Sequence, residues 1–157
     1  ARLSTDVGPV IDEEAQGVIT RHVEALRGKA KIIAEASAPE GAVNGTFVRP
    51  VAIEIASLAD LTREVFGPVL HVVRFRAAEI ETLVDAVNAL GYGLTLGLHT
   101  RIDETMHQVV ARARIGNIYV NRNQIGAVVG VQPFGGDGLT GTGPKAGGPH
   151  YLRALQQ

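Results

Sequence analysis

The sequence predicts an α/β fold in which helices flank a mainly parallel sheet. Segments with apolar residues at helical spacing alternate with short runs rich in β-branched residues along the whole chain. This order is typical of layered α/β proteins, in which ligand-binding residues collect in loops at the carboxyl ends of the strands. With 157 residues, the chain has the length of about one domain.

Four segments are predicted to be helices: residues 13–27, a short turn beginning at 57, residues 79–90 and residues 102–114. Asp12 is the predicted N-cap of the first helix, because a short acidic side chain can accept a hydrogen bond from the free N–H groups of the first turn. Gly28, which follows this helix, is predicted to end it.

Two of these helices begin with a pattern that is typical of a capping box. Ser57 precedes Asp60 by three residues, and Thr100 precedes Asp103 by three residues. The helix that begins at Ser57 must end before Pro68, since a proline disfavours the helical conformation in the residue before it.

Five apolar runs lie between the helices and are predicted to be strands: residues 31–35, 47–55, 69–75, 94–99 and 117–121. The glycine-rich stretch after Phe134 is predicted to be an ordered loop, because Phe134, Leu139 and Tyr151 could anchor it. A mobile carboxyl-terminal tail is the alternative reading of this stretch.

Composition excludes several classes of function for this chain. The net charge is -1, which gives no basic patch for nucleic acid, and the longest apolar runs are too short to span a membrane. The chain has no cysteine, so it forms no disulfide, no thiolate metal site and no cysteine nucleophile of its own. The five histidines have no metal-ligand spacing, and no metal site is predicted.

Two loops carry the candidate site residues. The stretch "REVFGP" places Glu64 and Phe66 directly before a strand, and the loop after residues 117–121 contains Gly126, Ala127 and Phe134. Glycine lets backbone N–H groups approach a ligand, and runs of such groups bind anions. The second loop therefore suits a small anionic substrate with an aliphatic body, while tight turns at a sheet edge stay open as the alternative.

The same stretches resemble the aldehyde dehydrogenase superfamily, through "EVFGPV", "PFGG" and "TGTG". A narrower resemblance extends over nearly the whole chain, through "GTFVRP", "REVFGPVLHVVRF", "GYGLTLGLHTRIDET" and "GNIYVNRNQIGAVVGVQPFGGDGLTGTGPKAGGPHYL". These motifs are similar to those of the L-glutamate γ-semialdehyde (1-pyrroline-5-carboxylate) dehydrogenases, and in particular of the dehydrogenase half of bifunctional proline utilization A.

The resemblance implies a role for each candidate residue. Glu64 would hydrogen-bond the nicotinamide ribose of NAD, and Phe66 would pack near the nicotinamide ring. Gly126 and Ala127 would offer backbone N–H groups to the α-carboxylate of the substrate, L-glutamate γ-semialdehyde, and Phe134 would wall its aliphatic chain. All five residues would then converge on one cleft.

The chain departs from the family pattern because it lacks the nucleophilic cysteine. In the family, that cysteine, the general-base glutamate and the cofactor-binding domain precede the stretch found here. Residues 1–157 are therefore expected to be the C-terminal part of a catalytic domain, inactive alone. The resemblance also implies a homodimeric, cytoplasmic parent protein in proline catabolism, with peripheral membrane association through the parent as a variant and FAD in a separate proline dehydrogenase domain.

Two other functions are weighed against the enzyme. A non-catalytic module that keeps the fold for assembly is the main alternative, but such a module has no need to retain the five site residues together. A free-standing binding protein is less favoured, because the face that packs on the cofactor domain would be open to solvent, which predicts self-association or instability of the isolated chain.

Overall fold

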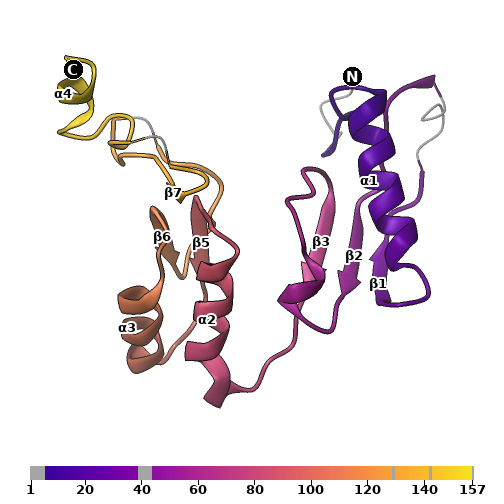
Figure 1. Cartoon of the computed structure of the whole chain (residues 1–157), viewed down its shortest axis with the longest axis horizontal. Coiled ribbons are helices and arrows are strands. Elements are labelled where there is room, and N and C mark those ends of the chain that lie inside the picture. Colours follow the sequence, from indigo (N-terminus) through magenta and orange to yellow (C-terminus); the bar gives the residue numbers. More distant parts are fainter. Residues whose placement is uncertain (1–5, 39–43, 129, 142, 157) are drawn as a thin grey trace. The chain divides into compact units, whose positions relative to one another are not determined.

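The computed structural model describes residues 6–38, 44–128, 130–141 and 143–156. By contacts between Cα atoms the chain divides into two compact units, Ala1–Arg74 and Phe75–Gln157 (Figure 1). Each unit contains both helices and strands, as predicted for an α/β fold. In the described ranges every helix is too short or too polar to cross a lipid bilayer.

The first unit consists of helix α1 (Glu13–Leu26) and a three-stranded sheet. The strands β1 (Lys31–Glu35), β2 (Val51–Glu54) and β3 (Val69–Val72) lie in the order β1-β2-β3. β2 and β3 are parallel, whereas β1 pairs antiparallel with β2. The prediction of a mainly parallel sheet therefore holds for β2 and β3 but not for β1, which follows α1 as an antiparallel edge strand.

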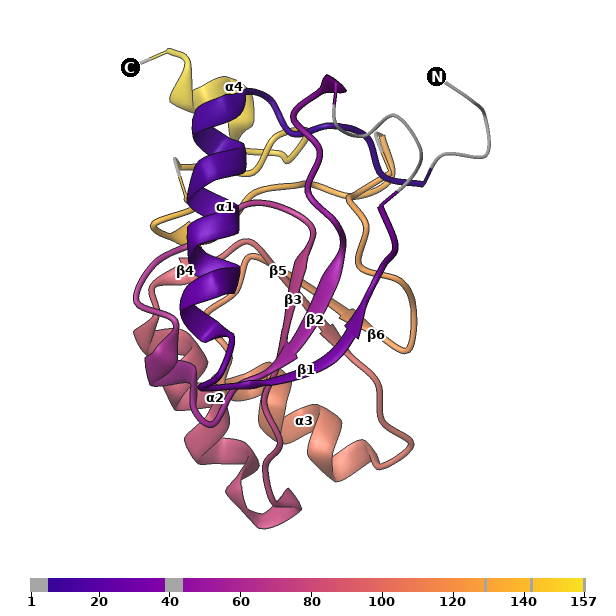
Figure 2. The ribbon, with the colours of Figure 1, turned by 90° about the vertical axis from the view of Figure 1, so that its right-hand side faces the viewer.

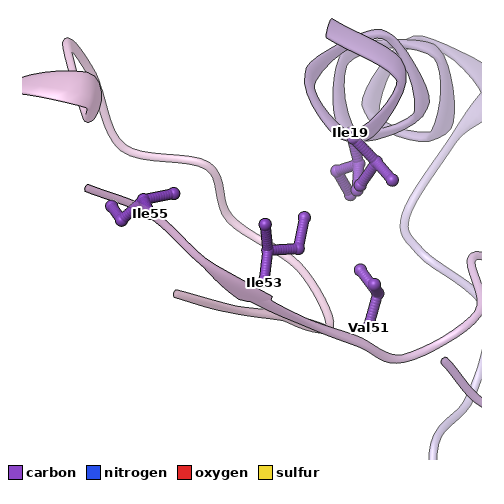
Figure 3. Close-up of a cluster of buried hydrophobic side chains, with 5 residues drawn as sticks. Ile19, Val51, Ile53 and Ile55 are labelled. Atoms are coloured by element: carbon purple, nitrogen blue, oxygen red, sulfur yellow. The ribbon is translucent and has the colours of Figure 1, made fainter. Parts of the chain in front are cut away.

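The core of the first unit lies between α1 and one face of this sheet (Figure 2). Ile19 on α1 points toward Val51 and Ile53 on β2 (Figure 3), and these two isoleucines are 1% and 0% exposed, respectively. Val51, Ile53 and Ile55 alternate along the chain, so all three side chains lie on the same face. Burial of this face, together with Val23, is what joins α1 to the sheet.

Local hydrogen bonds define the ends of the helical segments in the first unit. Asp12 accepts a hydrogen bond from the Ala15 N–H at 2.8 Å, which confirms the predicted N-cap of α1. The helix ends at Leu26, one residue earlier than predicted, and Gly28 follows it with φ +83°, as predicted for a glycine that ends a helix. The predicted capping box of Ser57 and Asp60 is also confirmed, around a 3₁₀ turn rather than an α-helix.

The second unit contains two helices that pack together and a parallel strand pair. In chain order its elements are a 3₁₀ turn (Ala77–Glu79), α2 (Ile80–Ala89), β4 (Tyr92–Gly93), β5 (Thr95–Leu98), α3 (Asp103–Arg112), β6 (Asn117–Val120), β7 (Asp137–Gly138) and α4 (Tyr151–Ala154). β5 and β6 are parallel and are joined through α3, and the two-residue strands β4 and β7 pair antiparallel. Arg112 on α3 holds Asp85 on α2 through two hydrogen bonds of 2.7 and 2.6 Å.

The predicted capping box at the start of α3 is wrong. The N-cap is Ile102, and the Thr100 hydroxyl accepts from the Ile102 N–H in a local turn. The physical reason is a tertiary contact: the side chain of Asn121 accepts from the Thr100 N–H and donates to the Thr100 carbonyl. Thr100 is thereby tied to the end of β6 and lies too far ahead of the helix to cap it.

The glycine-rich segment forms defined contacts, as predicted for an ordered loop, but not through all the predicted anchors. Leu139 is 73% and Tyr151 is 42% exposed, so neither is a buried anchor. Backbone hydrogen bonds hold the segment instead: Leu139 N–H donates to the Gly91 carbonyl, and Phe134 and Ala146 exchange two bonds of 3.0 and 2.8 Å. Phe134 is half-buried and is the one predicted anchor that is not exposed.

Candidate functional site

Glu64 and Phe66 lie in the first unit, on the segment that leads into β3. The residue between them, Val65, packs against the core of α1 and the sheet. Because side chains alternate along an extended segment, the inward position of Val65 leaves its two neighbours facing solvent. Glu64 is exposed and Phe66 is 86% exposed. Among the described residues, Glu64 takes part in no ion pair or side-chain hydrogen bond, so its carboxylate is free to accept bonds from a ligand.

The turn after Phe66 fits tightly against α1. A Cβ atom at Gly67 would lie 2.5 Å from Cδ1 of Ile19, so any larger residue would displace this buried side chain of the helix. Beyond this turn, the Pro68 carbonyl accepts from the Val51 N–H at 3.0 Å, which ties the segment to the start of β2. The exposed Glu64 and Phe66 thus precede a turn that is fixed by its packing on α1 and by its hydrogen bond to β2.

An open hollow of about 630 Å³ begins at the same turn. Its lining is mainly apolar and comes from the ends of all three strands and from the Gly67–Pro68 turn: Ala34, Glu35, Ala36, Pro50, Val51, Ala52, Gly67, Pro68, Val69 and Leu70. A mainly apolar concave surface of this size is typical of sites for small organic ligands. The hollow adjoins the residues that directly follow Phe66.

Gly126, Ala127 and Phe134 lie in the second unit, on a loop that returns along β6. Tyr119 on β6 has its hydroxyl 3.4 Å from the Gly126 carbonyl, and Asn117, two residues earlier on the same strand, contacts the backbone around Phe134. The loop therefore runs from the carboxyl end of β6 back toward its amino end. This path brings the two parts of the predicted substrate loop alongside one strand.

The Gly126–Ala127 backbone contains a left-handed residue and two N–H groups for which the described residues provide no acceptor. Gly126 has φ +62°, in the left-handed region that favours glycine. Within the described loop, the N–H groups of Gly126 and Ala127 donate to no protein acceptor. The guanidinium of Arg122 stacks over the Tyr119 ring at 4.8 Å, which adds a positive charge to the same loop. Such free N–H groups are suited to bind a carboxylate.

Asn117 is a residue of this site that the sequence reading missed. It is 8% exposed, and its side chain donates to the Pro133 carbonyl at 3.0 Å and accepts from the Gly135 N–H at 3.2 Å. A signal was present in the sequence, because an amide occupies an inward position of an otherwise apolar strand, two residues before Tyr119. A buried amide in such a place needs partners, and the loop supplies them.

Gly116, directly before β6, lies so close to the loop that it has no room for a side chain. A Cβ atom at this position would overlap the carbonyl oxygen of Gly135, which is backbone and cannot rotate away. Gly116→Ala is therefore expected to lower the free energy of unfolding by about 1–3 kcal/mol. The measurement is urea unfolding followed by tyrosine fluorescence, since all three tyrosines of the chain lie after residue 75.

The control is Gly8→Ala in the first unit, where a Cβ atom would meet no atom within 4 Å, and this substitution should leave the tyrosine transition unchanged. Equal effects of the two substitutions would show that Gly116 is not under steric constraint.

A pair of histidines in the first unit was also missed, since its members are 49 residues apart in the sequence. The Nε2 atoms of His22 on α1 and His71 on β3 lie 2.8 Å apart, with the rings in an edge-to-face arrangement. Within the described ranges, no group of three His, Asp or Glu side chains is arranged to hold a metal ion. The pair is a hydrogen bond between two imidazoles, one as donor and one as acceptor.

Because of this pair, we expect the free energy of unfolding of the first unit to decrease in acid. Burial lowers the pKa of both rings from the ordinary value of 6.5, and the charges of Arg63 on His22 and of His22 on His71 lower it further. As the pH falls below about 6.5, the unfolded chain binds protons that the folded unit resists, so the free energy of unfolding decreases. Denaturant titrations between pH 5 and about 7.5 should show this slope.

The variant His71→Asn is expected to reduce that slope, whereas His107→Asn, at an exposed position on α3, serves as the control. A slope that His71→Asn leaves unchanged would contradict the assignment.

Known proteins match the chain over its whole length. Residues 1–157 match the aldehyde dehydrogenase family. The "Bifunctional protein PutA" of Klebsiella aerogenes is 58% identical over 159 residues, which cover 98% of this chain, and that of Rhizobium meliloti is 59% identical over 152 residues. The 1-pyrroline-5-carboxylate dehydrogenase of Bacillus subtilis is 33% identical over 150 residues.

Solved structures agree with these relatives. The crystal structure of Proline Utilization A from Bradyrhizobium japonicum is 54% identical, with a TM-score of 0.87 over 94% of this chain. The structure of 1-pyrroline-5-carboxylate dehydrogenase from Thermus, described as having bound NAD, is 33% identical, with a TM-score of 0.81 over 94% of this chain.

The chain spans a small part of the relatives that it matches: 12% of the two PutA proteins and 28% of the Bacillus subtilis dehydrogenase. Glu64 and Phe66 belong to the first unit, and Gly126, Ala127 and Phe134 to the second. Their convergence on one cleft stays a prediction. The predicted family, in contrast, is confirmed: this chain belongs to the aldehyde dehydrogenase family.

Proposed function

We propose that this chain is the C-terminal part of an NAD-dependent L-glutamate γ-semialdehyde dehydrogenase, which oxidises the semialdehyde to glutamate in proline catabolism. The observation that carries the proposal is the loop along β6, where the two free N–H groups of Gly126 and Ala127 share a segment with Phe134. A carboxylate and an aliphatic chain are the two parts of this substrate that such a loop can bind. The relatives named as 1-pyrroline-5-carboxylate dehydrogenases support the same substrate.

Glu64 and Phe66 are proposed to contact NAD. Both are exposed on either side of the partly buried Val65, so a carboxylate and an aromatic ring could reach the same ligand from one short segment. A carboxylate can accept hydrogen bonds from both hydroxyls of a ribose, and an aromatic ring can pack on an apolar ring face. The bound NAD in the Thermus relative supports this cofactor.

The residues of this chain would bind and orient the reactants rather than attack them. NAD, when bound, accepts a hydride from the substrate. Glu64 would hold the ribose, while the Gly126–Ala127 backbone and Phe134 would hold the α-carboxylate and the aliphatic chain. Holding two reactants in a fixed relation lowers the entropic part of the barrier.

The chain itself contains no cysteine, so a thiol nucleophile would come from another part of the parent protein. The chain alone is therefore proposed to be inactive. The PutA relatives, named as bifunctional, support a parent with a second activity. We propose that the part of the parent with this second activity binds FAD and that the parent is a homodimer.

The test is to assay NADH formation from L-glutamate γ-semialdehyde, with the chain alone and with the longer polypeptide that carries it. The longer polypeptide is expected to be active and the chain alone inactive. Phe134→Ala in the longer polypeptide is expected to raise the KM for the semialdehyde about tenfold, because the wall against the aliphatic chain is lost. Phe75→Ala, at a 48% exposed position, is the matched control.

Two results would contradict the proposal. Activity of the chain alone would show that it carries its own nucleophile. A longer polypeptide that folds but oxidises no aldehyde would support the alternative, a non-catalytic module that keeps the fold for assembly.

A further inference from the structure

Asn117 is a buried polar residue of the second unit, and its side-chain amide lies on the apolar face of β6. The burial pattern of β6 alternates, with Asn117 and Tyr119 both buried on one face at 8% and 5% exposure. A buried amide is destabilising unless its donor and its acceptor both find partners. The partners that Asn117 finds are both backbone groups of the loop 133–135.

The two hydrogen bonds lie on either side of Phe134. The Nδ2 atom donates to the carbonyl of the preceding residue, Pro133, at 3.0 Å, and Oδ1 accepts from the N–H of the following residue, Gly135, at 3.2 Å. The N–H and carbonyl of Phe134 itself are both bonded to Ala146, at 3.0 and 2.8 Å. Four consecutive polar groups of the backbone are thus held, which leaves Phe134 little freedom except rotation of its side chain.

The amide of Asn117 suits both contacts, because the two partners differ in kind. One is a carbonyl, which needs a donor, and the other is an N–H group, which needs an acceptor. An aspartate would keep the acceptor and lose the donor, and an alanine would leave both backbone groups without a partner. Serine is too short to bridge two groups that lie on either side of a residue.

We propose that Asn117 is the positioning residue for Phe134, which it orients through the backbone on both sides. This inference rests on the proposed function, in which Phe134 walls the aliphatic chain of the semialdehyde. Asn117 touches no substrate in this scheme. Asn117 would affect catalysis only by fixing the position of the Phe134 ring.

The chain offers a matched control in Asn88, which bridges two backbone groups in the same way. Its Nδ2 atom donates to the Arg112 carbonyl at 3.0 Å, and its Oδ1 atom accepts from the Arg114 N–H at 2.8 Å. Asn88→Ala therefore removes a pair of hydrogen bonds of the same kind from the same unit, at the end of α3. Any effect that is due only to the loss of a bridging amide should appear in both variants.

Amide hydrogen exchange of the full 157-residue chain tests the contact directly. In Asn117→Ala, the Gly135 N–H is expected to exchange about tenfold faster, whereas in Asn88→Ala the Arg114 N–H should accelerate instead. If Asn117→Ala does not fold, Asn117→Asp replaces it, with the Gly135 N–H still protected and the Phe134 N–H exchanging faster. A Gly135 N–H that exchanges at an unprotected rate in the unmodified chain would overturn the inference.

A double-mutant cycle in the longer polypeptide tests whether Asn117 acts through Phe134. Asn117→Ala is expected to raise the KM for the semialdehyde several-fold with little change in kcat, and Asn88→Ala to change neither. In the Phe134→Ala background, Asn117→Ala should add less than about twofold, because two residues that act as one unit are not additive.

The outcomes separate this inference from the proposed function. Multiplicative effects of the two substitutions, or an Asn117→Ala enzyme with an unchanged KM beside an impaired Phe134→Ala enzyme, would overturn the positioning role alone. A Phe134→Ala enzyme with an unchanged KM would instead overturn the substrate contact on which both depend.

Discussion

Ile53→Ala is expected to lower the free energy of unfolding of the first unit by about 2–5 kcal/mol. Ile53 lies on the central strand β2 and is 0% exposed, in the core that Ile19, Val51 and Ile55 also form (Figure 3). The loss has two parts: the apolar surface that is no longer buried, and the cavity that the helix and sheet cannot close. Urea unfolding followed by far-UV circular dichroism measures the change.

Two controls separate the cavity from other effects of the substitution. Ile53→Val removes a single methyl group and is expected to have an effect of about 0.5–1.5 kcal/mol. Ile33→Ala removes the same atoms as Ile53→Ala from the neighbouring strand β1, but at a position that is 44% exposed. If the two alanine variants were equally destabilised, the core would not lie where α1 meets the sheet.

Glu64→Gln in the longer polypeptide is expected to lower kcat/KM for NAD about 10- to 100-fold. The glutamine keeps the shape of the side chain but has only one acceptor atom in place of a charged pair, so it would bind the two ribose hydroxyls less strongly. Less exact placement of the nicotinamide would also slow hydride transfer. Steady-state kinetics at varied NAD concentration, with NADH formation as the signal, give both parameters.

Glu14→Gln removes one negative charge from an exposed position on α1 of the same unit and should leave the NAD kinetics unchanged. If Glu64→Gln left the NAD kinetics of an active dehydrogenase unchanged, as this control should, the proposed contact between Glu64 and the ribose would be contradicted.

The predicted helices and strands agree with the structure where a local pattern defined them. Residues 31–35 form β1 as predicted, and α1 begins at the predicted residue, because Asp12 and Gly28 act through their own backbone neighbourhood. The predicted strand 47–55 is reduced to Val51–Glu54. Strand pairing, and not the apolar pattern, decides where a strand begins.

Features that depend on distant parts of the chain were missed or wrong. The direction of β1 is not encoded in its apolar residues, and the two-residue strands β4 and β7 are too short to have any pattern. The Thr100–Asp103 box failed because Asn121, 21 residues away from Thr100, holds the Thr100 backbone. In each case a contact between separate segments outweighed a local preference.

The sequence by itself determined the alternation of helices and strands and the two motif-bearing loops, because these follow from neighbours a few residues apart. The tertiary structure alone decided that Asn117 holds the backbone on both sides of Phe134, that His22 meets His71, and that Gly116 must lack a side chain. Those contacts join residues 16 to 49 positions apart. They exist only once strand pairing and core packing have brought the segments together, and no local pattern of residues specifies that step.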